Sequence, residues 1–486
     1  MLFNSYEFIF LFLPITFFIY FYLNKKRLTE VSKGFLVLSS LFFYSWWNIS
    51  YLPLILVSMV FNYGIGASLT KDKEHKKVSK KKLLTIGVIA NVGLLGYFKY
   101  SDFFISNVNF LVGSDIPLLN LALPLAISFF TFQQIAYLVD SYKGETKEYD
   151  FLNYVVFVTF FPQLIAGPIV HHKEMMHQFE NVRNKVINYK NIALGLFIFS
   201  IGLFKKVVIA DAFSVWATNG FDNAEILTLF EAWATSLSYT FQLYFDFSGY
   251  TDMAIGAALL FNIKLPINFN SPYKATDIQD FWRRWHITLS RFLRDYVYIP
   301  LGGNRKGNFR TISNLMATFI IGGIWHGSGW TFIFWGGGHG LALVVHHIWN
   351  QLGFKLNSII GWIITFNFVN ISWVFFRAKE WEDAIKVLKG MFGGSGVVLP
   401  TMLSNKLAFL SHYGVEFGGF VEHIRSDIYT QIWILFGFIL ILLFKNSMEK
   451  IDKLKFNLSI LVFMDLVSLI SILALYKESE FLYFNF

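Results

Sequence analysis

Apolar segments separated by short polar interruptions run along almost the whole chain. Most are long enough to be helices and too continuous to be amphipathic strands. We predict helical segments at residues 8–23, 34–47, 51–65, 83–98, 118–139, 154–170, 192–212, 227–247, 254–263, 312–325, 330–348, 359–376, 428–444 and 458–476. The pattern shows no convincing internal repeat and no soluble stretch of core-forming size, so a single membrane domain over residues 1–486 is expected.

The lengths of these segments differ. A straight membrane span needs about 20 apolar residues, with a range of about 17–25, and several segments are shorter. Non-helical backbone at membrane depth is tolerated only where protein or a water-filled cavity surrounds it. The short segments therefore predict re-entrant or half-depth helices around a cavity. Segment 160–170, with Pro162, Gly167 and Pro168, suits a broken helix.

Composition supports a multi-pass membrane protein. Of 486 residues, 55% are hydrophobic and only 15% are charged, and the mean hydropathy is +0.49. Soluble proteins carry about 25% charged residues. The chain has no cysteine, which excludes disulfides, thiolate metal sites and cysteine acyl carriers. The N-terminus lacks a basic start and a small-residue cleavage site, so its apolar run reads as a span and not as a cleavable signal.

The net charge of +9 is concentrated in a few stretches. They lie at residues 24–27, 71–82, 171–190 and 281–310, between apolar segments. Basic loops face the cytoplasm in membrane proteins, which places these stretches in the cytosol and the N-terminus outside. This distribution argues against nucleic-acid binding. The Gly-rich segment 389–426 is expected to be a loop.

Residues 277–299 read as one amphipathic helix lying in the membrane interface. At about 100° per residue, the large apolar side chains of 281–296 share one arc, interrupted by Ile287, and the arginines lie largely opposite. Asp277 and Asp280 suit the N-terminal end of that helix. His286 falls near the seam between the two faces, where its ring could reach toward the membrane interior.

The stretch GGIWHGSGWTFIFWGGGHG carries His326 and His339 in a segment expected in lipid. Ionisable residues are costly inside a membrane and mark functional sites by default, whereas a packing role is the plain alternative. Histidine also titrates near neutral pH and suits proton transfer. If the chain from Arg310 to His326 is helical, His326 lies roughly 24 Å along the helix from Arg310, deep in the bilayer. The flanking glycines permit close approach of a backbone or a ligand.

Other polar residues have simpler explanations. His346 and His347 lie close by in sequence, but no zinc spacing is present and no acidic residue intervenes, so no metal site is predicted. Asp246 and Asp252 flank Ser248 and Gly249, where helix capping is the favoured interpretation and a polar cavity lining the alternative. Hydrogen bonds between helices are expected of the polar side chains in segment 118–139, which are Ser128, Gln133 and Gln134.

Taken together, five motifs resemble the membrane-bound O-acyltransferase (MBOAT) family, and within it the bacterial AlgI-like branch of alginate and peptidoglycan O-acetyltransferase membrane subunits. They are LPLAISFFTFQQIAYLVDSY, PQLIAGPIV, YFDFSGYTDMAIG, FNSPYKATDIQDFWRRWHITLSRFLRDYVYIPLGGNR and GGIWHGSGWTFIFWGGGHG, in the family's order. The resemblance covers about residues 1 to 380, with the core motifs in 120–350. The long motif ending in PLGGNR is the specific one.

The resemblance implies an all-α ring of tilted helices around a central tunnel, and acyl transfer from coenzyme A thioesters to hydroxyls. His326 matches the family's invariant histidine. His286 matches the histidine that lies on the cytosolic side of the tunnel in DltB-like relatives, with Thr288 in place of that motif's first serine. His339 matches a further family histidine, expected to support His326 together with Trp325 and Asp246.

The resemblance also implies partners. AlgI-like proteins pass acetyl groups from cytosolic acetyl-CoA outward across the cytoplasmic membrane for O-acetylation of cell-surface polysaccharides, usually with a separate SGNH-type acetyltransferase. No SGNH domain is recognised in this sequence, so a partner is expected. No permanently bound cofactor is expected. Substrate binding is expected of Arg283, Arg284, Arg291, Asn270 and Ser271, because the arginines can attract the phosphates of coenzyme A.

Two other function classes stay open on the sequence alone. A transporter or flippase could use the intramembrane histidines as a proton relay; inverted repeats and paired broken helices would favour it, and neither is clear. A scaffold that only anchors an outer acetyltransferase would leave the histidines dispensable. The acyltransferase hypothesis instead predicts that His326→Ala abolishes acetylation of a polysaccharide such as peptidoglycan or an alginate-like glycan.

Overall fold

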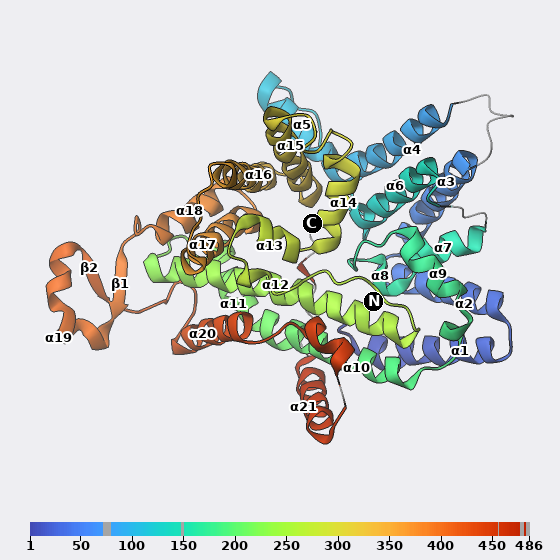
Figure 1. The fold of residues 1–486 in the computed structure, drawn as a ribbon. Helices are drawn as coiled ribbons and strands as arrows, with labels where there is room; N and C mark the ends of the chain where they lie inside the picture. Colours follow the sequence, from blue (N-terminus) through green and yellow to red (C-terminus); the bar gives the residue numbers. More distant parts are fainter. Residues whose placement is uncertain (71–78, 147–149, 455, 477–480, 483–486) are drawn as a thin grey trace. The chain divides into compact units, whose positions relative to one another are not determined.

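The computed structural model describes residues 1–70, 79–146, 150–454, 456–476 and 481–482, and these are overwhelmingly helical (Figure 1). Most of the basic stretch 71–82 lies outside the described residues. The chain divides into two compact units. The first comprises Met1–Leu203, Tyr250–Asn268 and Lys455–Phe486, and the second Phe204–Gly249 and Phe269–Leu454. The predicted all-α membrane class is confirmed.

Six helical stretches among the described residues are long and apolar enough to cross a membrane. They are Glu7–Lys25, Ile49–Thr70, Lys80–Val112, Tyr189–Asn223, Ser358–Arg377 and Tyr429–Glu449. The other predicted segments also contain helices, but residues 118–126 are not helical, and segments 227–247 and 254–263 join into one longer helix.

The first unit is built from helices of the N-terminal half and one C-terminal helix. Its elements are η1 (Glu7–Phe12), α1 (Leu13–Lys25), α2 (Thr29–Ser45), η2 (Ile49–Tyr51), α3 (Leu52–Thr70), α4 (Lys80–Leu95), η4 (Gly96–Tyr100), α5 (Ser101–Val112), α6 (Ile127–Lys143), α7 (Phe151–Thr159), α8 (Phe161–Leu164), α9 (His172–Glu180), η5 (Val182–Lys185), α10 (Tyr189–Phe204), whose last residue belongs to the second unit, and α21 (Leu458–Ala474). Helix α5 was not among the predicted segments.

Polar side chains tie helices of this unit together, as predicted for the polar residues of segment 118–139. Gln134 Oε1 on α6 accepts hydrogen bonds from Ser58 Oγ (2.8 Å) and from Asn62 on α3. Gln133 Nε2 donates to the carbonyl of Phe157 on α7 (2.7 Å). All of these residues are buried, where a satisfied amide fixes helix register. The predicted break in segment 160–170 is also confirmed, because α8 ends at Leu164 and residues 168–171 are not helical.

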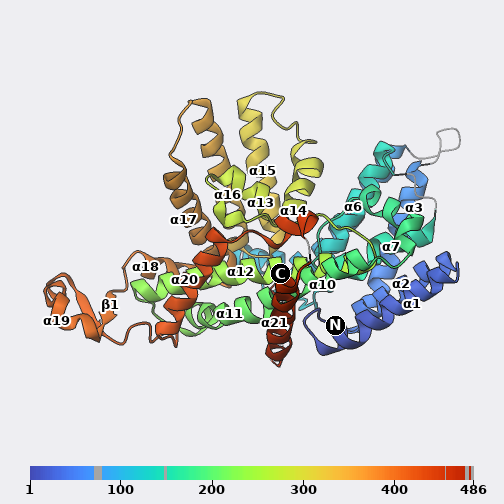
Figure 2. The ribbon, with the colours of Figure 1, turned by 60° about the horizontal axis from the view of Figure 1, so that its bottom comes forward.

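The second unit holds every residue assigned to the site on sequence grounds. Its elements are η6 (Lys205–Ala210), α11 (Asp211–Thr218), η7 (Asn219–Asn223), the first part of α12 (Leu229–Leu260), η8 (Pro272–Lys274), α13 (Ile278–Arg284), α14 (Ile287–Leu293), η9 (Arg294–Tyr298), α15 (Asn308–His326), α16 (Trp330–Gln351), α17 (Ser358–Arg377), α18 (Trp381–Met391), β1 (Val397–Pro400), η10 (Thr401–Leu403), α19 (Ser404–Leu407), η11 (Ala408–Tyr413), β2 (Val415–Gly418), α20 (Ile428–Leu443) and η12 (Ser447–Lys453). Figures 1 and 2 both show α13, α15, α16 and α17 grouped side by side.

Helix α12 corrects one prediction. Segments 227–247 and 254–263 form one continuous helix of 32 residues, so Ser248 and Gly249 lie in its interior and cap nothing. Asp246 instead forms an ion pair with Lys206 (2.7 Å), which also contacts Asp211 (2.9 Å). Lys206 and Asp246 are both almost fully buried. Pairing explains why the two charges are tolerated there.

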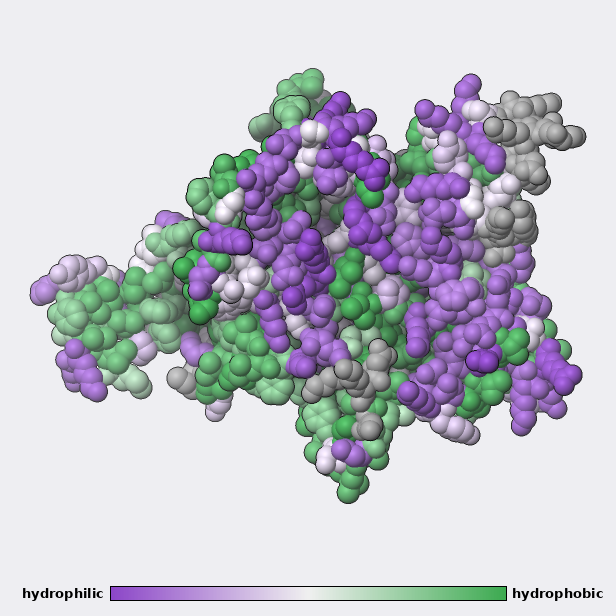
Figure 3. Space-filling view, viewed as in Figure 1, coloured by the Kyte–Doolittle hydropathy of each residue, from purple (hydrophilic) through white to green (hydrophobic). Residues whose placement is uncertain are grey.

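Segment 389–426 is also more ordered than the predicted loop. Strands β1 and β2 pair in parallel, with Val397 opposite Val415, and α19 lies between them in sequence. Figure 3 shows apolar surface over this part of the unit. Met402 and Phe409 are among its exposed apolar residues.

Helices α15 and α16 form an antiparallel hairpin whose close packing depends on glycine. A Cβ at Gly323 would lie 2.4 Å from the Phe332 carbonyl oxygen, and one at Gly336 would lie 2.4 Å from the Phe319 carbonyl oxygen. At the other end, Gln351 Nε2 donates to Asn308 Oδ1 (2.9 Å). Some of the glycines around the two histidines therefore serve the approach of one backbone to another.

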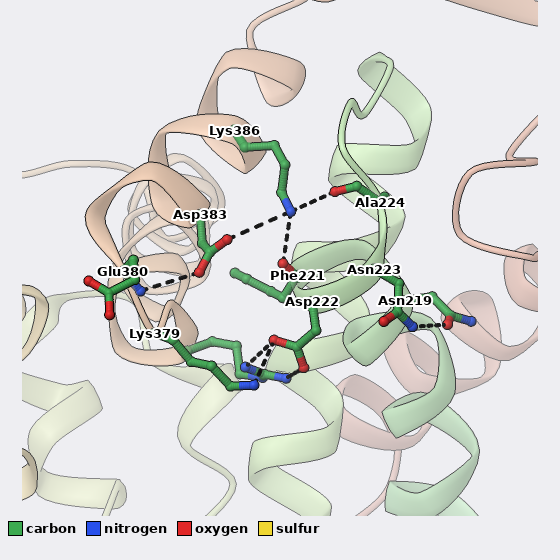
Figure 4. A network of polar contacts seen from close by, with 10 residues as sticks. Asn219, Phe221, Asp222, Asn223, Ala224, Lys379, Glu380, Asp383 and Lys386 are labelled. Atoms are coloured by element: carbon green, nitrogen blue, oxygen red, sulfur yellow. Dashed lines mark hydrogen bonds and ion pairs between the residues drawn. The ribbon is translucent and has the colours of Figure 1, made fainter.

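A network of polar contacts holds the C-terminal end of α17 (Figure 4). Lys386 Nζ on α18 donates to the carbonyls of Phe221 (2.8 Å) and Ala224 (2.7 Å) at the end of η7. Arg377, the last residue of α17, pairs with Asp222 (2.6 Å). A cation at helix C-terminal carbonyls is favourable, so Lys386 stabilises the end of η7, and the Arg377–Asp222 pair ties the end of α17 to it.

Candidate active site

His286 lies at a break that the sequence did not reveal. The predicted single helix over 277–299 is wrong: α13 ends at Arg284, α14 begins at Ile287, and His286 between them has φ 43° and ψ 53°. Left-handed backbone at a residue other than glycine costs roughly 1–2 kcal/mol. Such strain gathers at functional sites. The predicted start is correct, because the Asp277 side chain accepts from Asp280 N (2.8 Å) and caps α13.

The break turns the His286 ring into the interior of the unit. The side chain is fully buried, with its ring centroid 4.8 Å from Phe247 and 6.3 Å from Trp325. His286 lies outside the six candidate spans. Burial lowers the pKa of His286 below its ordinary value, because desolvation disfavours the imidazolium. The ring is therefore neutral near pH 7 and has the form that accepts a proton.

His326 ends α15 inside a cage of aromatic rings. Its ring centroid lies 4.8 Å from Trp325, 5.0 Å from Trp335 on α16 and 5.1 Å from Phe376 on α17. The side chain is only 3% exposed. Trp325 contacts both His326 and His286, so the structure brings together two histidines that are 40 residues apart in the sequence.

His339 is held by hydrogen bonds at both ring nitrogens. The Trp282 indole N–H donates to His339 Nδ1 (3.2 Å), and an indole has no acceptor. Nδ1 must therefore be unprotonated, and Nε2–H donates to Ser372 Oγ (3.0 Å). Ser372 in turn donates to the Val369 carbonyl (2.8 Å). This chain fixes one tautomer and one orientation of the ring.

Trp335 lies between His326 and His339 and contacts both rings. Its ring centroid lies 5.0 Å from His326 and 4.9 Å from His339, and it stacks on Trp373 at 5.7 Å. Within the described part of the chain, the buried indole N–H groups of Trp335 and Trp373 have no hydrogen-bond acceptor. A buried donor without a partner costs roughly 1–3 kcal/mol. Trp335 lies beside His326 and Trp373 stacks on Trp335, so these donors suit a site that receives an oxygen acceptor from a substrate.

Trp282, Trp335, Ser372 and Trp373 were not among the predicted site residues. Trp335 lies four residues before His339, one helical turn away, and that spacing was a usable signal. No local pattern could pair Trp282 or Ser372 with His339, because they lie 57 and 33 residues away.

The predicted substrate-binding residues differ in their exposure and in the partners that they already have. Arg283 is exposed and Arg291 is half-buried on the next helix. Arg284 pairs with Asp280 (2.9 Å), and its backbone carbonyl accepts from Asn270 N (2.9 Å). The pairing with Asp280 partly neutralises Arg284 as an anion ligand.

Ser271 has a structural partner. Its Oγ donates to Glu449 Oε1 (3.2 Å). Asp246 likewise engages Lys206, while the next residue, Phe247, contacts His286. Asp246 therefore lies one residue from a His286 contact on α12 and is itself paired with Lys206. No group of three or more metal-ligating side chains occurs within the described ranges.

Comparison with known proteins agrees with these features. Residues 7–379 match the membrane-bound O-acyltransferase (MBOAT) family. This stretch includes His286, His326, His339 and Ser372.

Three relatives illustrate the range of similarity. The chain is 55% identical over 441 residues to a peptidoglycan O-acetyltransferase of Helicobacter pylori, covering 85% of this chain and 83% of the relative. It is 40% identical over 399 residues to a probable alginate O-acetylase, AlgI, of Pseudomonas aeruginosa, covering 81% and 75%. It is 27% identical over 290 residues to a teichoic acid D-alanyltransferase of Streptococcus thermophilus, covering 52% and 68%. The chain is a multi-pass membrane O-acyltransferase and belongs to the MBOAT family.

Proposed function

We propose that this protein uses cytosolic acetyl-CoA to acetylate hydroxyl groups of an extracytoplasmic polysaccharide, from a position in the bacterial cytoplasmic membrane. The observation that carries the proposal is the aromatic cluster in which Trp325 contacts both His286 and His326. A donor on one side and an acceptor on the other need a protected meeting point within the membrane. Peptidoglycan is the favoured acceptor, because the relative at 55% identity carries that name.

His326 is assigned as the general base. Its imidazole takes the proton of the acceptor hydroxyl as the oxygen attacks the thioester carbonyl. The C–S bond then breaks, the coenzyme A thiolate takes the proton back from the imidazolium, and an acetyl ester and free coenzyme A leave. A positioned base of this kind contributes roughly 10²–10⁴-fold in rate.

The other residues have binding and orienting roles in this proposal. His286 lies toward the donor side, where Arg283 and Arg291 supply positive charge for the phosphates of coenzyme A. His339 orients Trp335 against His326. A separate SGNH-type acetyltransferase on the outer side is the expected partner in this acetylation.

The transporter alternative fits the geometry less well. A proton relay needs ring nitrogens that exchange partners. His339 has Trp282 as a donor at Nδ1 and Ser372 as an acceptor at Nε2, so its protonation would require the Trp282 contact to break.

Purified protein tests the donor assignment. We expect release of free coenzyme A thiol from acetyl-CoA when the protein is reconstituted in liposomes with its outer partner and a glycan fragment, and no release with His326→Gln. A protein that carries a labelled glycan across the liposome membrane and never consumes acetyl-CoA would contradict the proposal and favour a transporter.

A further inference from the structure

A groove runs between α16 and α17 on the outside of the second unit. It encloses about 720 Å³, within the range of small-molecule sites. Its lining is almost entirely apolar and includes Phe334, Leu341 and Val345 of α16 and Ile364, Phe368 and Ile371 of α17. Leu341 is 57% exposed and Ile364 is 54% exposed, so the groove opens outward from the helix pair.

The groove is long and narrow. Its lining on α17 extends from Gly361 to Phe375, roughly 21 Å along a helix. Its floor on α16 includes Gly338 and Ala342, whose small side chains leave room between the helices. A Cβ added at Gly338 would meet no atom within 4 Å. These dimensions suit a single extended acyl chain.

One end of the groove is polar. A second hollow of about 260 Å³ adjoins it there and shares Asp277 and His346 with it. Asp277 lies 3.7 Å from His346, so that acid already has a cationic neighbour when the ring is protonated. Lys355 also lines this hollow, is exposed, and forms no ion pair within the described residues. The N-terminus of α17 follows at Ser358 and adds the positive end of a 20-residue helix.

The residues around the polar end of the groove are mostly basic. The hydrogen bond between Asn308 and Gln351 places the start of α15 beside the end of α16. Arg305 and Lys306, just before α15, and Arg310, in its first turn, are exposed. Basic residues mark the cytoplasmic side, where the lipid headgroups carry negative charge and basic pockets between helices bind them.

We propose that this groove binds one anionic phospholipid of the cytoplasmic leaflet. One acyl chain lies between α16 and α17, and the phosphate lies at Lys355 and the N-terminus of α17. The inner part of the groove is lined by Trp335 and Ser372, so the bound lipid packs behind the residues that hold His339. The inference does not depend on the identity of the donor or the acceptor.

Native mass spectrometry of the detergent-purified protein tests the proposal. The probes are phosphatidylglycerol and phosphatidylcholine with identical acyl chains. Gly338→Leu fills the groove. Gly337→Leu is the matched control, because a Cβ at Gly337 also meets nothing within 4 Å but Gly337 does not line the groove. We expect wild type and Gly337→Leu to retain one phosphatidylglycerol, and Gly338→Leu to lose it by at least about tenfold.

The headgroup is tested separately. Lys355→Gln should weaken retention of phosphatidylglycerol roughly fivefold and leave phosphatidylcholine unchanged. If Gly338→Leu fails to fold, Ala342→Phe fills the same groove. Retention by folded groove-filling variants, or equal retention of the two lipids by wild type, would overturn the proposal. Displacement of phosphatidylglycerol by palmitoyl-CoA in wild type alone would overturn it too, because the groove would then hold the acyl chain of a donor.

Discussion

At the scale of single residues, the histidines of the second unit differ in how they are held. His339 has a donor at one ring nitrogen and an acceptor at the other, and this arrangement keeps it neutral and fixed. His326 is surrounded mainly by the rings of Trp325, Trp335 and Phe376. We therefore expect His339 to position its neighbours, and we keep the proposal that His326 acts on the substrate.

Ser372 should therefore affect turnover without touching substrate. Ser372→Ala removes the acceptor of the His339 Nε2–H, so the ring and the Trp335 packed on it lose their fixed orientation. We expect kcat to fall roughly 10- to 100-fold with little change in KM, and Ser372→Thr to restore it because the hydroxyl is kept. Steady-state kinetics of the purified variants measure the split. Equal loss in the alanine and threonine variants would point to packing alone.

At the scale of elements, the apolar pattern predicted α15, α16 and α17 to within a few residues. Long, strongly apolar helices with clear breaks at Gly327 and Gly353 are the favourable case. The pattern failed at α12, because Ser248 and Gly249 read as a break and yet lie inside one helix. The pattern also failed at His286, where the chain turns although no glycine or proline indicates a break.

The candidate site was also predictable only in part, because sequence patterns report local structure. Family motifs and charge identified His286, His326 and His339. The hydrogen-bond partners of His339 are Trp282 and Ser372. They come from other helices, and their contacts depend on tertiary packing that no local spacing encodes.

The packing of the α15–α16 hairpin makes opposite predictions for two nearby glycines. Gly323→Ala puts a methyl group 2.4 Å from the Phe332 carbonyl oxygen and should destabilise the protein by about 1–3 kcal/mol. Gly337→Ala meets open space and should be neutral or stabilising by up to about 1 kcal/mol, because alanine favours helix. Thermal unfolding in detergent compares them. Equal melting temperatures would contradict the close contact.

At the scale of the whole molecule, the proposed acyl transfer needs a fixed orientation of the protein in the membrane. Helix α17 has 20 residues and is about 30 Å long, which is one crossing. The basic residues before α15 should then face the cytosol, and segment 389–426 beyond α17 should face outward.

Single-cysteine labelling tests this orientation directly, because the chain has no cysteine of its own. Lys306 and Met402 are both exposed. In intact spheroplasts, an impermeant maleimide should label Met402→Cys, whereas Lys306→Cys should react only after permeabilisation. Labelling of both positions from the same side would refute the single crossing by α17.

The central claim is that His326 performs the acyl transfer. The most direct measurement is ester-linked acetate in peptidoglycan from a deletion strain complemented with wild type, His326→Gln or His412→Ala, with membrane levels of each protein determined. His412 is exposed and remote in sequence, so its variant is the matched control. We predict wild-type acetate with His412→Ala and background acetate with His326→Gln at equal protein level, as expected for loss of a base worth roughly 10²–10⁴-fold. Wild-type acetate with His326→Gln would contradict the account.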